Sequence, residues 1–571
     1  MYANLRDHGI ILEMQLPLTS ARLDCLLAGH DKTRTPHAVI VELKQWDRVS
    51  PTDVEECVVT YIGGKERVVP HPSVQVAHYN QYLSDTSTAF QGDGAIVLGA
   101  CSYAHNFVYD PMSPFYGSKF ADVLKRYPLF AGNQADELAA YLSLRLEGGE
   151  GEVVLNKVLQ SRYRASKKLL DHAAQMIRGA NEFTLLDDQI VVFNTILDYA
   201  RKGFRQPRKS VVLVKGGPGT GKSLLALNVV GTLSHEGLNT QHATGSRAFT
   251  QNVRRIVGSR ATAQFKYFNG YVDAEPNDID VLVMDEAHRI RESSNSMYTP
   301  KARRSTKTQI EELVSAAKVS VFFIDDDQVV RPGEVGNSSI VREAASKFGA
   351  TLVEEELRTQ FRCAGSDAFI QWVDNTLAVR ATPTEYWDPN DAFDFKIVDS
   401  PEELESAIHS KISQGSTGRV AAGFCWPWSD PQPDGTLISD VVIGNFARPW
   451  NAKPDAGKLA PGVPRSHFWA SDPNGISQIG CIYTAQGFEF DYIGVIFGKD
   501  LERDSSVGGW EGRKEFSKDS VVAKRAKGNF LSYVKNTYRV LLTRGMKGCF
   551  VYFMDAGTRR FFESRILRGS T

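Results

Sequence analysis

A glycine-rich segment, KGGPGTGKS, follows the apolar run SVVLV and precedes the helix-forming run SLLALNVV. This succession of strand, loop and helix is the context that the G-x-x-x-x-G-K-S/T pattern requires. Glycines let a backbone wrap around phosphate with its N–H groups pointing inward, and the start of a helix adds partial positive charge. We therefore expect a phosphate-binding loop made of Gly216, Gly217, Pro218, Gly219, Thr220, Gly221, Lys222 and Ser223.

Within that loop, Lys222 is placed to pair with the outer phosphates of a nucleotide, and Ser223 to hold Mg²⁺. A pair of acids, Asp285 and Glu286, ends a second apolar run, VLVMDEAH. Asp285 can bind the Mg²⁺ directly or through water, while Glu286 can orient and deprotonate an attacking water. The two segments predict hydrolysis of ATP with Mg²⁺. GTP is less expected, because no NKxD-type segment that would read guanine stands out.

A second set of acids lies near the amino terminus. The runs ARLDCLLAG and AVIVELKQW place Asp24 in one strand and Glu42 with Lys44 in another. Alternate residues of a strand share a face, so Glu42 and Lys44 can meet Asp24 across a hairpin. Two acids can bind Mg²⁺ and a lysine can position water, which is what phosphodiester hydrolysis requires. An ordinary exposed Glu–Lys pair on a strand is the alternative.

The bulk properties indicate a multidomain globular protein. The chain has 571 residues, of which 42% are hydrophobic and 23% charged, and no apolar run approaches the roughly 18 residues that span a bilayer. The start, MYANLRDHGIILEM, lacks the features of a secretory signal, so we expect a cytoplasmic protein. The seven cysteines are scattered, which favours reduced thiols over a zinc or disulfide site.

The elements that position these residues change along the chain. Up to about Tyr109 the sequence alternates strands with one helix, VQVAHYNQYL, and from about Ser118 to Asn181 it is helix-forming, as in ADELAAYLSLRL and LNKVLQSRYRASKKLLDHAAQMIRGA. After Phe183, short apolar strands alternate with helices, which predicts parallel sheets covered on both faces. A second such series follows Glu354 and closes with YRVLLTRG and GCFVYFMD; the segments from Trp426 to Ser466 and from Glu502 to Lys527 resemble loops or insertions. We therefore predict domains at 1–148, 183–353 and 354–571, with a helical connector at 149–182.

The order of KGGPGTGKS, DEAH, DDDQ, QFR, TAQGFEFD and LLTRG resembles that of a superfamily 1 helicase, specifically the bacterial Schlafen group 3-type DNA/RNA helicase domain. The resemblance runs from about Phe183 to the C-terminus. It implies two tandem RecA-like domains, with ATP in the cleft between them, and an ATP-driven helicase or translocase acting on nucleic acid, DNA being favoured over RNA. The letters DEAH also occur in superfamily 2, but AQGFEFD and LLTRG fit superfamily 1 better.

The same resemblance assigns roles to further residues. In FTLLDDQ, Gln189 would read the adenine edge, and in FFIDDDQVVRP, Gln328 would sense the terminal phosphate. Arg362 of ELRTQFRC and Arg544 of YRVLLTRG would stabilise charge on the transferred phosphoryl group, for which a planar, permanently charged guanidinium is suited. YTAQGFEFD would bring Thr484 near the nucleic-acid backbone and Gln486, Gly487 and Glu489 near the nucleotide sugar.

Contacts to the nucleic-acid backbone are also expected from HATGSRAFTQNVRR, through Thr244, Arg247 and Arg254. A solvated helix start explains that segment equally well.

The amino-terminal acids resemble the PD-(D/E)XK nuclease family, with Arg22-Leu23-Asp24 in place of Pro-Asp. Gln75 and Tyr79 match the glutamine and aromatic residue often found beside that family's site. The chain departs from the family because no helix precedes the first strand, where Glu13 would be a partial substitute for the missing acid. A small restriction-endonuclease-like domain of α/β class is the implied fold.

Three functions remain open from the sequence. The first is a helicase or translocase fused to an Mg²⁺-dependent nuclease, in DNA repair or in attack on foreign DNA. The second is an ATP-gated nucleic-acid-binding switch with an inactive nuclease-like domain. The third is a plain ATPase whose amino-terminal module binds DNA without cutting it.

Overall fold

The computed structural model describes residues 7–17, 19–92, 94–161, 184–203, 206–258, 263–295, 299, 304–504, 508–526 and 528–567. These residues form two compact units. The first comprises the described residues up to 161 together with 184–202 and 356–359, and the second comprises those from 203 to 355 and from 360 onwards. No helix in the described ranges has the length and apolar character needed to cross a membrane.

The first unit is a small α/β domain with a mixed five-stranded sheet in the order β1-β2-β3-β6-β7. β1 pairs antiparallel with β2, and β2 with β3, whereas β3 with β6 and β6 with β7 are parallel. A separate hairpin of β4 and β5 leads into helix α1 (Pro72–Thr86). The strands are β1 (Gly9–Gln15), β2 (Arg22–His30), β3 (Pro36–Lys44), β4 (Cys57–Ile62), β5 (Lys65–Pro70), β6 (Val97–Ala104) and β7 (Leu129–Ala131).

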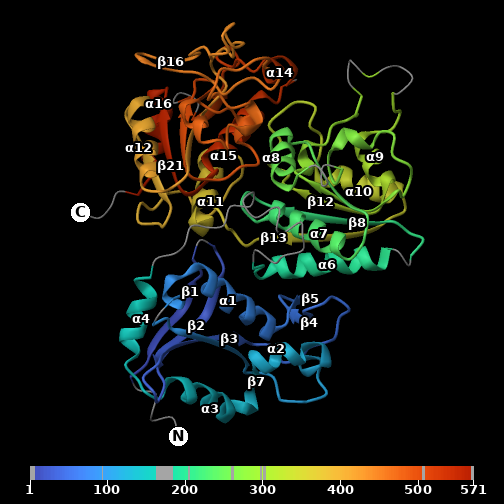
Figure 1. Ribbon diagram of the computed structural model, residues 1–571, viewed down its shortest axis with the longest axis vertical. Helices are drawn as coiled ribbons and strands as arrows, with labels where there is room; N and C mark the ends of the chain where they lie inside the picture. The colour runs from blue at the N-terminus through green and yellow to red at the C-terminus, as the bar shows by residue number, and fades with distance from the viewer. Residues whose placement is uncertain are drawn as a thin grey trace. The chain divides into compact units, whose positions relative to one another are not determined.

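Helices cover both faces of this sheet. Helix α1 packs against β3 and β6, and α3 (Ala135–Leu146) lies on the opposite face (Figure 1). Val39 and Val41 of β3 join the core under α3. Because side chains alternate along a strand, Glu42 points to the other face, toward α1. The remaining helices are α2 (Ala121–Arg126), α4 (Gly151–Leu159) and α6 (Asp188–Gly203).

The second unit contains two parallel sheets, and both are RecA-like. The first has the strand order β10-β9-β11-β12-β8-β13, and the pairs from β10 to β8 are parallel. Its strands are β8 (Ser210–Gly216), β9 (Thr240–Thr244), β10 (Phe265–Tyr267), β11 (Ile279–Asp285), β12 (Ala317–Ile324) and β13 (Thr351–Leu357). The helices are α7 (Lys222–His235), α8 (Arg247–Val257), α9 (Gln309–Ala316) and α10 (Ser338–Lys347). The apolar residues of β8 and β11 are buried, as expected for strands covered on both faces.

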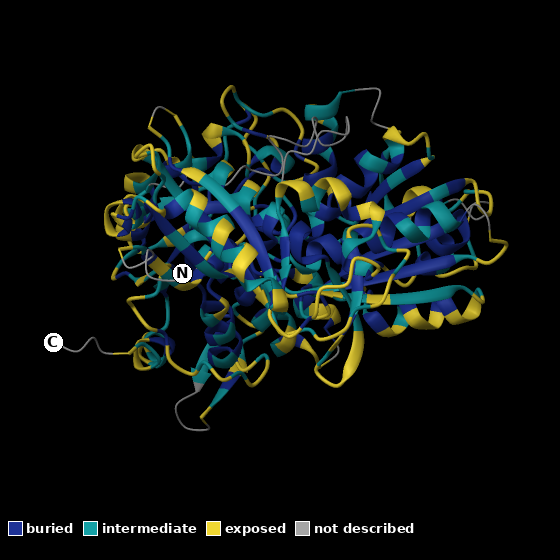
Figure 2. Ribbon diagram, turned by 90° about the horizontal axis from the view of Figure 1, so that it is seen from below, coloured by how far each residue is buried: buried dark blue, intermediate teal, exposed yellow. Residues whose placement is uncertain are grey.

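The second parallel sheet has the order β14-β21-β18-β15. Its strands are β14 (Asp394–Ile397), β15 (Gly418–Ala422), β18 (Phe490–Phe497) and β21 (Gly545–Phe553). Helix α12 (Pro401–Ser413) packs on one face, while α11 (Asp367–Thr376) and α15 (Phe530–Leu542) pack on the other (Figure 1). The C-terminal helix is α16 (Ala556–Ser564). In Figure 2 many strand segments are buried, as β15 and β18 are, whereas the helices alternate between buried and exposed residues.

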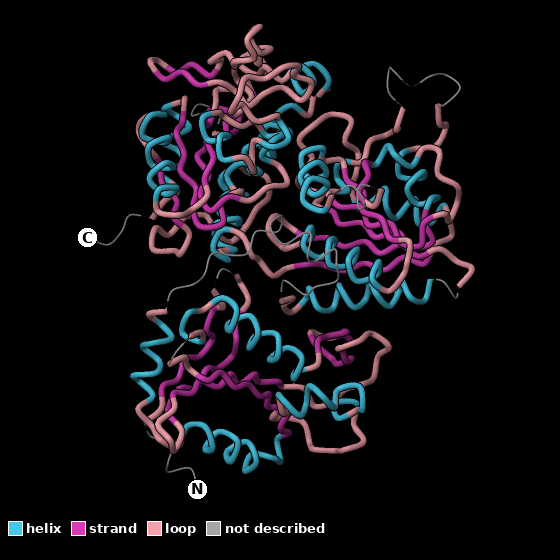
Figure 3. The backbone as a smooth tube through the Cα atoms, in the orientation of Figure 1, coloured by secondary structure: helices cyan, strands magenta, loops and turns pink. Residues whose placement is uncertain are grey.

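Between β15 and β18 lies a long insertion. It is mostly loop around the short hairpin of β16 (Val441–Ile443) and β17 (Phe446–Arg448), as Figure 3 shows. Trp426, Val441 and Trp450 of the insertion are buried in the core beneath α12. The segment after β18 contains the hairpin β19 (Leu501–Asp504) and β20 (Gly509–Gly512), followed by α14 (Ser520–Arg525).

The structure can be compared with the sequence expectations in three further places. YRVLLTRG is the end of helix α15 and the turn after it, whereas GCFVYFMD is strand β21. The expected division between residues 353 and 354 falls inside β13. Helix α4 ends at Leu159, and the rest of the expected helix, with most of the connector 149–182, lies outside the described residues.

Candidate functional site

The phosphate loop follows β8 and ends where α7 begins. Gly219 and Gly221 have φ values of +80° and +82°, which favour glycine. The Lys222 ammonium donates to the carbonyls of Gly216 and Gly217 at 2.8 and 2.7 Å, and Thr220 Oγ1 donates to Gly217 at 3.0 Å. Lys222 is buried, which lowers its pKa, although nearby Asp325 and Glu286 act in the opposite direction. The loop therefore holds a buried cation at the start of a helix.

The acid pair ends the buried strand β11. Asp285 is 1% exposed, and the backbone N–H of Glu286 donates to its Oδ1 at 2.9 Å. Glu286 has a φ of +54°, an unfavourable conformation for a residue with a side chain, and its Oε2 lies 3.0 Å from His288 Nε2. Burial raises the pKa of Glu286, but the charges of His288, Lys222 and Arg544 outweigh it, and the net pKa is well below the ordinary value. Glu286 is thus an ionised carboxylate beside the phosphate loop.

Two arginines from the second RecA-like domain reach the same cluster of buried charged side chains, at the junction of the two RecA-like domains, which we call the ATP cleft. Arg362 donates from Nη2 to Glu489 Oε1 at 2.6 Å, and Arg544, which is 1% exposed, donates from Nε to the carbonyl of Val540 at 3.2 Å. Burial and the neighbouring Arg362 lower the pKa of Arg544 to about 9. Two buried guanidinium groups that repel each other form a site suited to an anion.

The segment that carries Arg362 packs directly on the phosphate loop. Gln360 Nε2 donates to the carbonyl of Pro218 at 2.6 Å, and the backbone N–H of Phe361 donates to Gly219 at 2.9 Å. A Cβ at Gly219 would lie 2.0 Å from Gln360 Oε1 and 2.4 Å from Arg362 Cβ. This close approach explains why residue 219 is glycine.

Gln328 and Asp325 extend the cleft from the end of β12. Gln328 Nε2 donates to Asp325 Oδ2 at 2.8 Å, and Asp325 is near enough to Lys222 and His288 for their charges to lower its pKa against the effect of burial. Gln328 Oε1 and Arg362 Nε are buried without a hydrogen-bond partner among the described residues. The donor Arg362 Nε, left unpaired beside three buried cations, fits a polyphosphate ligand, and the acceptor Gln328 Oε1 fits a water molecule.

The structure thus brings Lys222, Asp285, Glu286, Gln328, Arg362 and Arg544 into one cleft, and their catalytic roles stay predictions. Gln486 Nε2 lies 3.2 Å from His288 Nε2, and Glu489 reaches Arg362, so this segment also borders the cleft. Gln189 is buried at the start of α6 in the first unit, where its Oε1 accepts the N–H of Leu186 at 3.3 Å. Its expected role as an adenine reader also stays a prediction.

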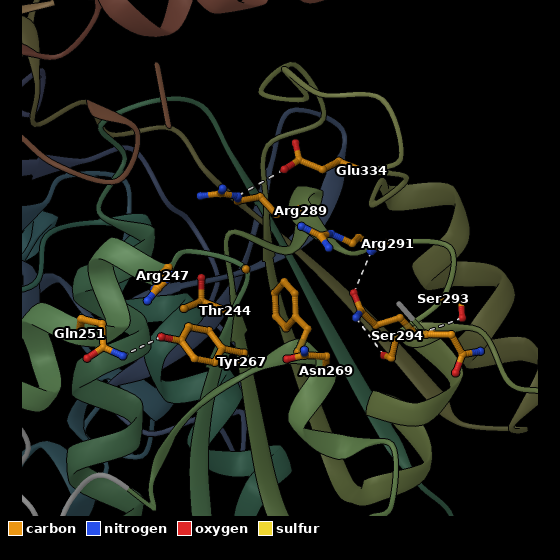
Figure 4. Close-up of a pocket in the computed structure, with 14 residues that line it drawn as sticks. Thr244, Arg247, Gln251, Tyr267, Asn269, Arg289, Arg291, Ser293, Ser294 and Glu334 are labelled. Carbon is orange, nitrogen blue, oxygen red and sulfur yellow. Dashed lines mark hydrogen bonds and ion pairs between the residues drawn. The ribbon is translucent and has the colours of Figure 1, made fainter. Parts of the chain in front are cut away.

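Two adjoining pockets beside the cleft form what we call the basic groove. They share Gly245, Arg247, Arg289 and Arg291, which Figure 4 shows in part. The groove adds the cations Arg331 and Lys518 and the aromatic residues Tyr267, Phe268, Phe424, Trp428 and Tyr483. Its lining has two carboxylates, Glu334 and Asp519, against five Arg and Lys side chains, so the groove is cationic.

Not all the residues expected to contact the nucleic-acid backbone lie in the basic groove. Thr244, Arg247 and Thr484 all line the basic groove. Arg254 does not: its Nε donates to the carbonyl of Phe265 at 2.9 Å, and its guanidinium lies over the Tyr267 ring. Arg254 therefore fastens α8 to β10.

The amino-terminal acids come together in the first unit. The register of β2 and β3, with Cys25 opposite Val41, brings Asp24 beside Glu42, and Asp24 Oδ2 accepts the N–H of Leu43 at 2.7 Å. Lys44 Nζ donates to Glu42 Oε1 at 2.7 Å. Glu42 is 3% exposed, and burial, together with Asp24 and Asp187, raises its pKa to about 7 against the effect of Lys44.

The helix α1 adds Gln75 and Tyr79 to this cluster. Both donate to Asp187 Oδ1, Gln75 from Nε2 at 3.0 Å and Tyr79 from its hydroxyl at 2.5 Å. Glu13 lies on β1 between residues paired with Cys25 and Leu23; it is exposed, with a φ of +51°. In the described part of the chain, no three His, Cys, Asp or Glu side chains converge as metal ligands.

Residues 209–555 match the family model of the Schlafen group 3, DNA/RNA helicase domain. The chain belongs to this family. It is therefore an ATP-hydrolysing enzyme of helicase type, with two RecA-like domains in its second unit. An uncharacterized protein of Saccharomyces cerevisiae, YPL245W, is 24% identical over 450 residues, which cover 70% of this chain and 94% of that protein.

Solved helicase structures are also similar to this chain. The Pif1 helicase from Bacteroides, in complex with ADP-AlF3 and ssDNA, has 12% identity and a TM-score of 0.27, and the match covers 65% of this chain and 94% of that one. The Pif1 helicase from Candida albicans has 13% identity and a TM-score of 0.30, covering 67% and 99%.

Several residues at these sites were not singled out in the sequence. Asp325 is one of three successive aspartates, and only its burial next to Lys222 separates it from Asp326 and Asp327. Arg289 and Arg291 directly follow DEAH, and Arg331 follows DDDQ. A basic residue just after each motif was the available signal. Asp187 gave no signal, because its partners on α1 lie more than 100 positions away.

Proposed function

We propose that this helicase couples ATP hydrolysis to movement along, or remodelling of, a single nucleic-acid strand. The phosphates of ATP bind in the loop 216–223, where Lys222 exchanges the carbonyls of Gly216 and Gly217 for the outer phosphates. Ser223 and Asp285 would hold Mg²⁺, which would neutralise charge on the phosphates when bound. The unpaired donor Arg362 Nε supports a polyphosphate ligand at this place.

The hydrolytic step is assigned to Glu286. Its carboxylate is held ionised by the charges of His288 and Lys222, so it can orient water and accept a proton. Arg362 and Arg544 would stabilise the charge that develops on the transferred phosphoryl group. Since both belong to the second RecA-like domain, catalysis requires that this domain be packed against the first, as it is through Gln360 and Phe361.

The observation that carries the proposal is that three short segments join the ATP cleft to the basic groove. In the first, Glu286 faces the cleft and Arg289 and Arg291 line the groove. In the second segment, Asp325 and Gln328 border the cleft and Arg331 lines the groove. In the third, Gln486 and Glu489 border the cleft, and Tyr483 and Thr484 line the groove. In each segment at most six positions separate a residue of the cleft from a residue of the groove. Binding or loss of the terminal phosphate in the cleft can therefore shift the groove.

The groove suits a single strand because it combines cations with aromatic rings. Arginine and lysine side chains track a phosphodiester backbone, and rings such as those of Trp428 and Tyr483 can stack on bases. The guanidinium of Arg331 already lies 5.2 Å from the centroid of the Tyr483 ring. We favour DNA over RNA as the strand.

The test is Mg²⁺-dependent ATP hydrolysis without polymer and with single-stranded DNA, duplex DNA or RNA, beside a strand-separation gel. Wild type should be stimulated by a single strand, most by DNA, and Lys222→Ala should not turn over ATP under any condition. Lys347→Ala, a surface change on α10, is the control and should behave as wild type. Turnover indifferent to every polymer would overturn the motor in favour of a switch or plain ATPase.

We propose cleavage of nucleic acid as a second activity, located in the first unit. The convergence of Asp24, Glu42 and Lys44 supports a PD-(D/E)XK-like nuclease. Glu42 Oε2 is buried without a hydrogen-bond partner among the described residues, which fits a missing cation. Asp24 and Glu42 would hold Mg²⁺, and because no third described His, Cys, Asp or Glu completes a metal-binding group with them, the other ligands would be water and the substrate phosphate. Together with a DNA preference, such cleavage would suit repair or attack on foreign DNA.

A gel assay of the same polymers with Mg²⁺ tests this activity. Glu42→Ala should abolish cleavage and leave ATP turnover unchanged, whereas Glu66→Ala, an exposed acid on β5, should cleave as wild type. Cleavage that survives Glu42→Ala would reject the site, and absence of cleavage by wild type would leave a degenerate front domain.

A further inference from the structure

The segment before α6 docks on α1 through specific contacts within the first unit. His78 Nδ1 lies 2.5 Å from the carbonyl of Leu185, and Leu186 is fully buried. Two residues of α1 one turn apart, Gln75 and Tyr79, both donate to one carboxylate oxygen of Asp187. The segment therefore inserts its acid into the cluster that contains Glu42 and Lys44.

This placement of Asp187 is electrostatically unfavourable. The cluster already contains Asp24 and Glu42, with Lys44 as the cation beside them, and Asp187 adds a third negative group close enough to Glu42 to raise its pKa. The backbone at Asp187 has a φ of +46°, a left-handed conformation that is unfavourable for a residue with a side chain. An asparagine would make the same two hydrogen bonds without the charge, so a purely structural role does not explain an aspartate.

The donors that Asp187 occupies are those that a phosphate would use. Gln75 Nε2 and the Tyr79 hydroxyl converge on one anionic oxygen, and Lys44 is near enough to lower the pKa of Asp187. A phosphodiester offers the same kind of ligand, an acceptor oxygen with negative charge. Gln75 and Lys44 are partly exposed, but Tyr79 is 2% exposed and its hydroxyl donates to Asp187, so a phosphate can take that hydroxyl only in place of Asp187.

We propose that Gln75, Tyr79 and Lys44 form a phosphate-binding subsite of the nuclease-like domain, and that Asp187 holds it closed as an internal substitute for a nucleic-acid phosphate. The proposal rests on the nuclease-like site proposed above. It assigns Asp187 an inhibitory contact and not a place among the catalytic acids, in agreement with the absence of three converging metal ligands in the described ranges.

The test measures access to the subsite separately from cleavage. A single-stranded DNA oligonucleotide carrying 5-iodouracil is photo-crosslinked to the full-length protein, and the yield on the peptide containing residues 72–86 is determined by mass spectrometry. Asp187→Ala should raise that yield on the order of tenfold, because a charged hydrogen-bonded competitor is removed. Asp187→Asn keeps the side-chain shape and should raise the crosslinking yield by a smaller factor. It is the control for a variant that fails to fold.

A double variant identifies the donors. Adding Gln75→Ala to Asp187→Ala should return the crosslinking yield toward that of wild type, because the phosphate would lose one of its donors. An unchanged or lower yield in both Asp187 variants would overturn the inhibitory contact. A yield that rises in Asp187→Ala but does not fall again with Gln75→Ala would overturn the subsite.

Cleavage of the same oligonucleotide separates this proposal from the nuclease itself. Faster cleavage by Asp187→Ala than by wild type supports both the nuclease activity and the inhibitory contact. Loss of cleavage in the Asp187 variants would make Asp187 a catalytic acid and overturn the inhibitory role. A raised crosslinking yield with no cleavage by any variant supports the subsite and rejects the nuclease.

Discussion

Arg539 on α15 reaches from the second RecA-like domain to the end of β12 in the first, where its Nη1 lies 3.9 Å from Asp325 Oδ2. The same guanidinium binds both carboxylate oxygens of Asp374 through Nε and Nη2. All three side chains are buried, and Asp325 also faces Lys222 of the phosphate loop. One arginine thus joins the second domain to the acid that faces the loop lysine.

Replacement of Arg539 by alanine should destabilise the second unit. Asp374 would be left buried with a single remaining cation, Arg380, and Asp325 would lose its partner on α15. Removing one member of a buried ion pair costs about 3 to 5 kcal/mol. Urea unfolding followed by tryptophan fluorescence should show a lower midpoint for the Arg539→Ala variant.

Arg380 provides a matched control, because it binds the same carboxylate from a side chain that is 50% exposed. Arg380→Ala should cost about 1 kcal/mol or less. Equal losses in the two variants would contradict the view that burial of Arg539 decides the effect.

Arg544→Ala should lower kcat for ATP on the order of 10³-fold while ATP binding changes little, because the guanidinium is needed for charge that develops in the transition state. Arg544→Lys should restore only part of the rate, since an ammonium lacks the planar fork. Steady-state turnover and equilibrium binding of a fluorescent ATP analogue separate the two effects. Arg559→Ala, on the surface of α16, is the control, and an unchanged kcat in Arg544→Ala would reject the role.

The sequence predicted the phosphate loop and the acid pair because both depend on short-range spacing: an apolar strand, a turn that needs glycine, and a residue at the strand end. The helical structure of YRVLL was not evident, since a short buried apolar run has no periodicity that separates helix from strand. The second parallel sheet was nevertheless expected correctly from the alternation of apolar runs after Glu354.

Contacts between distant segments could not be predicted in this way. The pairing of Arg539 with Asp374 and the docking of Asp187 on α1 join positions more than 100 residues apart, and no local pattern records them. Arg254 shows the converse: it belongs to a basic helix that suggested phosphate contacts, but packing turns its guanidinium onto Phe265 and Tyr267. Residue type indicated the chemistry, and tertiary packing decided which side chains take part.

Arg291→Ala should weaken binding of a single-stranded oligonucleotide and reduce the slope of log K against log salt by about 1, because one phosphate contact is lost. Arg291 is exposed and lines the basic groove. Arg254→Ala removes an equal charge from a neighbouring element, but its guanidinium is committed to the Phe265 carbonyl, so the slope should not change. Fluorescence anisotropy at several salt concentrations measures both, and equal slopes in Arg291→Ala and wild type would remove Arg291 from the interface.

His71 should destabilise the first unit as the pH falls from about 6.5 toward 4, while Glu42, whose pKa burial raises to about 7, adds stability over the same range. Burial lowers the pKa of His71 to about 4, and in the neutral ring Nδ1 accepts the N–H of Ser73 at 3.1 Å while Nε2 donates to the carbonyl of Phe115 at 2.9 Å. Protonation of Nδ1 would replace that acceptor with a donor. A group whose pKa is lower in the folded state contributes stability above its unfolded pKa of about 6.5 and loses it as the pH falls to its folded value, here roughly 3 kcal/mol in total.

Trp46 allows this loss to be measured in the full chain, because the other seven tryptophans lie at position 372 or beyond. Urea unfolding at several pH values, followed by the 5-fluorotryptophan NMR signal of Trp46, should show a wild-type midpoint that falls relative to that of His71→Asn between pH 6.5 and 4, because Glu42 titrates in both proteins. His71→Asn keeps a side-chain acceptor for the start of α1 but does not titrate, so its midpoint should lie below that of wild type at neutral pH, and the difference should shrink as the pH falls. A pH dependence that is the same in wild type and His71→Asn would place the titrating group elsewhere.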